Sequence, residues 1–188
     1  MTSIHDILDQ LRAVAYDERD KGARFEALIQ AFLLIEPQYQ DLYDEVWLWK
    51  DYPERNGRVD TGIDLVARSR ATGEYTAIQC KFYAPGTPIT QEHVASFITA
   101  SGKLLNGAPE FTGRLVVSTS DNWGKNAEAA VENQNPPVAR LRVQDLDDSS
   151  IDWSKFELAT PGTLTKKPHK IPFPHQKKAI ENVLKGFG

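Results

Sequence analysis

The sequence predicts an α/β fold in which helices flank a mixed central sheet. Two runs rich in apolar, β-branched residues, within 60–67 and 74–83, are separated by a short turn that contains Arg70-Ala-Thr-Gly73, a pattern typical of paired strands joined by a hairpin. Segments with apolar residues at helical spacing precede this pair. Shorter strand-like and helical segments alternate after it, an order that suits a mixed sheet with helices on both faces.

Two helices are expected before the first strand. Apolar side chains recur at helical spacing over residues 3–15 and again over 21–35. Pro37 is expected to end the second helix, because proline lacks the amide donor that a helix interior needs. A strand over residues 43–50 and a loop over 51–57 then lead to the paired strands.

The second half of the chain alternates between the two kinds of element. Thr90 is a suitable N-cap for a helix that reaches about Leu105. A buried-type strand follows at 114–119, a helix at 125–133 and a last strand at 138–143. The resulting order is α-α-β-β-β-α-β-α-β, and we expect residues 1–155 to form one domain.

Composition limits the possible functions. With 188 residues, 40% of them hydrophobic and 26% charged, the chain suits a globular domain, and no apolar run is long enough to span a bilayer. The single Cys80 cannot form an internal disulfide, and the expected location is the cytoplasm. A formal net charge of −4 argues against tight DNA binding by this chain alone, since phosphate contacts need lysine and arginine.

Three polar residues of the paired strands are expected to converge. Successive side chains of a strand point to opposite faces, so Gln79 and Lys81 share one face while Cys80 turns toward the core. Asp64 opens the neighbouring strand and can face the same point. An acid, an amide oxygen and an ammonium placed together can hold a divalent metal beside a water and a phosphate.

The two motif strings, D-x-G-I-D-L-V-A at 60–67 and I-Q-C-K-F-Y at 78–83, resemble the PD-(D/E)XK nucleases in their Mrr-like branch. The resemblance covers roughly residues 15–145 and implies a restriction endonuclease-like core that hydrolyses phosphodiester bonds of double-stranded DNA. It implies Mg²⁺ as the cofactor, held by Asp64, Gln79 and the backbone carbonyl of Cys80. It also implies that Lys81 is the catalytic lysine, which orients the attacking water or stabilises developing negative charge.

The glutamine departs from the acid that most of these nucleases carry. An amide removes one unit of negative charge, which weakens metal affinity unless another acid contributes. Two acids are candidates: Asp60, four residues before Asp64, and Glu26 of the run G-x-x-F-E at 22–26, which resembles the run opening the Mrr-like fold. Each is equally well explained as a structural acid, Asp60 as a turn cap and Glu26 as a solvated helical residue.

The end of the chain changes character. Residues 156–172 are expected to be a linker, because proline and lysine are frequent there and no periodicity is present. Residues 173–188 resemble the entry helix of superfamily 2 helicase motors, in which a glutamine, here Gln176, reads the adenine of ATP. The alternative is an ordinary amphipathic helix.

Together the two resemblances imply the N-terminal part of a Type ISP restriction-modification enzyme, which depends on ATP and carries nuclease, helicase-like motor, methyltransferase and target-recognition domains in one polypeptide. DNA tracking and sequence choice would then belong to the other domains. Two alternatives stay open: a stand-alone Mrr-like restriction endonuclease, and a catalytically silent nuclease fold kept as a docking module.

Overall fold

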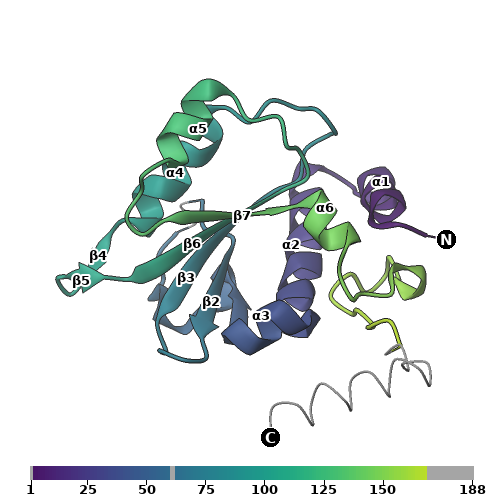
Figure 1. The fold of residues 1–188 in the computed structure, drawn as a ribbon, viewed down its shortest axis with the longest axis horizontal. Coiled ribbons are helices and arrows are strands. Elements are labelled where there is room, and N and C mark those ends of the chain that lie inside the picture. The colour runs from purple at the N-terminus through teal and green to yellow at the C-terminus, as the bar shows by residue number, and fades with distance from the viewer. Residues whose placement is uncertain (1, 60–61, 169–188) are drawn as a thin grey trace, which may run out of the picture.

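A computed structural model describes residues 2–59 and 62–168, which form a five-stranded sheet with helices on both faces (Figure 1). The helices are α1 (Ile4–Val14), α2 (Glu18–Ile35), α3 (Pro37–Leu42), α4 (Gln91–Ser101), α5 (Lys125–Val131) and α6 (Val143–Asp147). The strands are β1 (Tyr43–Leu48), β2 (Leu65–Ser69), β3 (Tyr75–Lys81), β4 (Leu104–Leu105), β5 (Ala108–Pro109), β6 (Phe111–Ser118) and β7 (Val138–Arg142).

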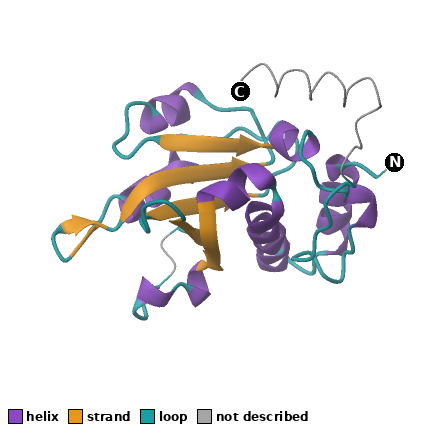
Figure 2. Cartoon of the chain, turned by 60° about the horizontal axis from the view of Figure 1, so that its bottom comes forward, coloured by secondary structure: helices purple, strands orange, loops and turns teal. Residues whose placement is uncertain are grey.

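The central sheet is mixed, as the sequence predicts. Its strand order is β1-β2-β3-β6-β7; the pairs β1-β2 and β2-β3 are antiparallel, and the pairs β3-β6 and β6-β7 are parallel. Each parallel connection contains a helix, α4 in the first and α5 in the second, because parallel neighbours need a long crossover. Figure 2 shows helices on both sides of the strands.

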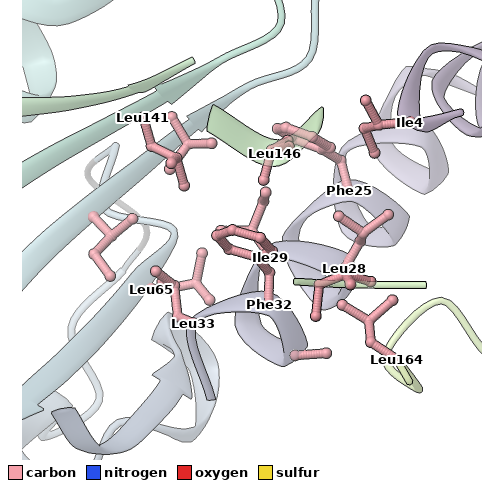
Figure 3. Packing of buried hydrophobic residues seen from close by; sticks show 14 of the residues in the cluster. Ile4, Phe25, Leu28, Ile29, Phe32, Leu33, Leu65, Leu141, Leu146 and Leu164 are labelled. Carbon is pink, nitrogen blue, oxygen red and sulfur yellow. The ribbon is translucent and has the colours of Figure 1, made fainter. Parts of the chain in front are cut away.

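The larger core lies between the sheet and α2. Alternate strand residues point to this face, and α2 contributes Phe25, Leu28, Ile29 and Phe32, all buried. Figure 3 shows these helix side chains lying between the sheet residues Leu65 and Leu141 and the flanking Ile4 and Leu164. Cys80 packs against this cluster, as the strand alternation predicts.

The opposite face of the sheet is covered by α4. Val66, Ala77 and Val116 point to this side and pack with Phe97 and Ala100 of the helix. The intervening strand residues face α2, so each strand contributes to both cores and the sheet is buried on both faces.

Helix α2 begins earlier than its apolar pattern indicates. Asp17 is its N-cap, and the carboxylate of Asp17 accepts a hydrogen bond from the backbone N–H of Asp20 (2.8 Å). The helix ends at Ile35, as expected, yet Pro37 is the first residue of the short helix α3, a position where its missing donor costs nothing.

Two features after the paired strands differ from expectation. Helix α4 ends at Ser101 rather than near Leu105, because Gly102 caps it and the chain then forms the β4-β5 hairpin. The last strand, β7, is followed directly by helix α6 (Val143–Asp147), where the sequence predicts no helix.

Residues 156–168, expected to be a linker, lie against the domain. Leu164 is buried in the α2 core, and the backbone N–H of Asp152 donates to the carbonyl of Thr165 (2.7 Å). Residues 173–188, for which a helicase-like helix is expected, lie outside the described residues. Within residues 2–59 and 62–168 no helix is both long and apolar enough to cross a bilayer.

Candidate active site

The antiparallel β2-β3 pair brings the motif residues to one end of the sheet. Asp64 immediately precedes β2, whereas Gln79 and Lys81 lie at the C-terminal end of β3. Leu65 pairs with Ile78, which places Asp64 beside Gln79. On its other side, the carbonyl of Asp64 accepts a hydrogen bond from the backbone N–H of Trp49 (2.8 Å). Asp64 is therefore fixed between two neighbouring segments.

The backbone of Cys80 faces the carboxylate of Asp64. Its N–H donates to Oδ2 of Asp64 at 2.6 Å. Along β3, the carbonyl of Ile78 accepts from Asp64, while the carbonyl of Lys81 accepts from Thr119 beyond the end of β6. Because backbone groups alternate sides along a strand, the Cys80 carbonyl lies on the β2 side of β3, the side from which Asp64 approaches.

The side chain of Gln79 is buried, with 1% of its surface exposed. Its Nε2 donates to the carbonyl of Gly62 (3.0 Å). Its Oε1 is buried and has no hydrogen-bond partner among the residues that the structure describes. A buried amide oxygen without a hydrogen-bond partner is costly unless it binds something else, so this atom is available to a ligand.

Three charged residues contribute to the pKa of the Cys80 thiol. Burial raises the pKa of the Cys80 thiol well above its usual value; the carboxylates of Asp64 and Glu26 raise it further, and the ammonium of Lys81 lowers it. Burial also raises the pKa of the Tyr83 hydroxyl, with a further contribution from Asp64. Asp64, Glu26 and Lys81 thus lie in the electrostatic neighbourhood of the same residue, Cys80.

The remaining candidates have different positions. Glu26 lies on α2, one turn after Gly22, on the side of the sheet that Cys80 faces. Asp60 and Gln176 lie outside the described residues. No pattern in the sequence indicates a role for Gly62, whose carbonyl accepts a hydrogen bond from the Gln79 amide.

The donor set suits a hard divalent cation. Asp64 offers a carboxylate, Gln79 an amide oxygen and Cys80 a carbonyl, and oxygen ligands of this kind are those that Mg²⁺ prefers. In the described part of the chain no three His, Cys, Asp or Glu side chains gather as a metal cluster. A site here would therefore rely on the amide and the backbone, and water would complete the coordination, as Mg²⁺ tolerates.

Comparisons with known proteins identify the family of this chain. A family model described as restriction endonuclease (Mrr_cat_2) matches residues 34–163, a range that contains the motif strands but begins after Glu26. Restriction endonucleases of this family generally use divalent metal ions. A search of curated proteins returns no match.

One solved structure is similar over the whole chain. It is described as the ATP-dependent Type ISP restriction-modification enzyme LlaBIII bound to DNA, with 31% sequence identity and a TM-score of 0.81. The match covers 100% of this chain but only 11% of the solved chain, so the similarity concerns a small part of that enzyme. With its matching family model, its mixed sheet and its motif strands, this chain belongs to the Mrr-like restriction endonuclease family.

Proposed function

We propose that the chain is a Mg²⁺-dependent endonuclease domain that hydrolyses phosphodiester bonds of double-stranded DNA. The observation that carries this proposal is the buried, unpartnered oxygen of Gln79 beside the carboxylate of Asp64. A nuclease fold retained only for docking gains nothing from a buried acceptor that stays unsatisfied, because such an atom loses its hydration without a compensating hydrogen bond.

Each residue of the site has a distinct part. Asp64 supplies the charged ligand, and Gln79 and the Cys80 carbonyl supply neutral ones. Bound Mg²⁺ would lower the pKa of a water molecule and neutralise phosphate charge. The ammonium of Lys81, at the end of β3, orients the attacking water or stabilises the negative charge that develops on the phosphate. Glu26 and Asp60 are candidates for further negative charge near the ligands.

We further propose that the domain acts within an ATP-dependent restriction-modification enzyme of the Type ISP kind. The similarity to LlaBIII over the whole chain supports this context rather than a stand-alone Mrr-like endonuclease. Helicase-like, methyltransferase and target-recognition domains of the same polypeptide would then deliver DNA to the nuclease. ATP would serve the motor, with Gln176 as its adenine contact, and would have no part in the hydrolysis at Asp64.

The test uses the complete polypeptide that the gene encodes, incubated with supercoiled plasmid and ATP. Nicked or linear DNA should form with Mg²⁺ and disappear when the metal is chelated with EDTA. The variant Lys81→Ala should retain ATP hydrolysis and lose cleavage. Cleavage that persists in EDTA would contradict metal dependence. Absence of cleavage in the unaltered enzyme, with ATP hydrolysis intact, would favour the docking module instead.

A further inference from the structure

Gly62 occupies a position that only glycine fits. Its φ is +90°, a backbone conformation that other residues rarely adopt. A Cβ atom built on Gly62 would lie 2.8 Å from Oγ of Ser96, 3.4 Å from Nε2 of Gln79 and 3.4 Å from the backbone nitrogen of Phe97. The segment before Asp64 therefore passes close to both α4 and the Gln79 amide, and a side chain at residue 62 would push against both.

The carbonyl of Gly62 decides which way the Gln79 amide faces. The two ends of a primary amide have nearly the same shape, so packing alone does not distinguish them. Nε2 donates to the Gly62 carbonyl at 3.0 Å; with the amide reversed, two oxygen atoms would stand at that distance instead. The hydrogen bond thus directs Oε1 away from Gly62, and this oxygen is the one left without a partner in the described part of the chain.

We propose that Gly62 is a positioning residue of the nuclease site: its carbonyl holds the Gln79 nitrogen, so that Gln79 presents its oxygen to the metal. This inference rests on the proposed function. Interactions that orient a metal ligand are worth about 10–100-fold in metal affinity. The pairing also explains the amide, because a carboxylate has no hydrogen to donate to the Gly62 carbonyl. The Gly62 carbonyl therefore favours glutamine over glutamate at position 79.

The experiment measures binding of Mn²⁺ alone, by electron paramagnetic resonance, to the protein without DNA. Gly62→Ala should lower the affinity about tenfold or more. Gly73→Ala is the matched control: Gly73 has φ +73° in the hairpin between β2 and β3, and a Cβ there meets nothing within 4 Å. It carries similar backbone strain without touching the site, so its Mn²⁺ affinity should equal that of the unaltered chain.

A double-mutant cycle separates positioning from general damage. If Gly62 acts through Gln79, then Gly62→Ala should have no further effect on Mn²⁺ affinity in a Gln79→Ala background. Should Gly62→Ala fail to fold, Gly62→Ala with Ser96→Ala removes the 2.8 Å clash and keeps the 3.4 Å contact with Nε2, and Ser96→Ala alone serves as its reference. The side-chain amide signals of Gln79 in a ¹⁵N NMR spectrum should shift on addition of Mg²⁺ and lose that response in the Gly62 variant.

The outcomes separate the two claims. An unaltered chain that binds no Mn²⁺, with Gln79 signals indifferent to Mg²⁺, would overturn the metal site and with it the proposed function. Normal binding in the unaltered chain, together with equal affinities for Gly62→Ala and Gly73→Ala, would overturn the positioning role alone. A full tenfold loss that persists in the Gln79→Ala background would also overturn it, because Gly62 would then act by another route.

Discussion

The carboxylate of Asp64 accepts a hydrogen bond from the backbone N–H of Cys80, with 2.6 Å between Oδ2 and the nitrogen. Cys80 lies between Gln79 and Lys81 on β3, so this bond ties the acid of one strand to the strand that carries the other two candidate residues. Hydrogen bonds to an ionised acceptor are stronger than neutral ones. This hydrogen bond therefore fixes the position of Asp64 relative to the strand that carries Gln79 and Lys81.

Asp64→Asn should separate the structural role of this residue from its chemical one. The amide oxygen can still accept from Cys80, so the free energy of unfolding should change by no more than about 1 kcal/mol. Loss of the charge should reduce DNA cleavage by roughly a thousandfold or more. Plasmid nicking and urea denaturation measure the two effects. Asp44→Asn is the control, since Asp44 pairs with Arg68 on β1 and β2 and should leave cleavage unchanged.

Lys81→Ala should abolish cleavage and spare metal binding. The ammonium acts on the water or the phosphate rather than on the cation, so its removal should cost roughly a thousandfold in cleavage rate. Mn²⁺ affinity should be unchanged or slightly stronger, because a positive charge has left the site. Lys103→Ala, an exposed lysine after α4, is the control. Near-normal cleavage by Lys81→Ala would refute the assignment of Lys81.

Gln79→Glu tests two opposing effects of a carboxylate. The added negative charge strengthens binding of a divalent cation. However, a buried carboxylate has no hydrogen to donate, so a carboxylate oxygen would face the carbonyl oxygen of Gly62. In the metal-free protein only the second effect operates, so the free energy of unfolding should fall by roughly 1–3 kcal/mol. Mg²⁺ should restore part of the loss.

Denaturation by urea, with and without Mg²⁺, provides the measurement for this variant. Gln91→Glu is a suitable comparison, because Gln91 is exposed in the first turn of α4, where an acid is tolerated. If Gln79→Glu is as stable as Gln91→Glu without metal, the hydrogen bond to Gly62 does not select the amide.

The 188-residue chain alone should bind duplex DNA weakly and cleave it poorly. It has 26 acidic side chains against 22 lysines and arginines, so it lacks the excess positive charge that supplies non-specific affinity. A gel-shift titration at physiological salt is the measurement. Sub-micromolar affinity would contradict the view that other parts of the enzyme deliver the DNA.

The sequence by itself determined the mixed sheet, the helices on both faces and the position of Asp64 beside the strand that carries Gln79 and Lys81. These follow from local periodicity: alternation fixes which strand residues share a face, and a short turn fixes an antiparallel pair and thus which ends meet. The same rule placed Cys80 toward the α2 core, where the structure has it. Where a cap or a turn competed with the apolar pattern, as at Asp17 and Gly102, the predicted ends were displaced.

Only the tertiary structure decided how the Gln79 amide is oriented. Alternation predicts the face on which a side chain lies, but which end of the Gln79 amide donates depends on the carbonyl of Gly62, 17 residues away and before β2. The φ of Gly62 and its approach to Ser96 depend likewise on where α4 packs across the sheet. Such contacts depend on three-dimensional packing between segments distant in the sequence, and no local periodicity encodes them.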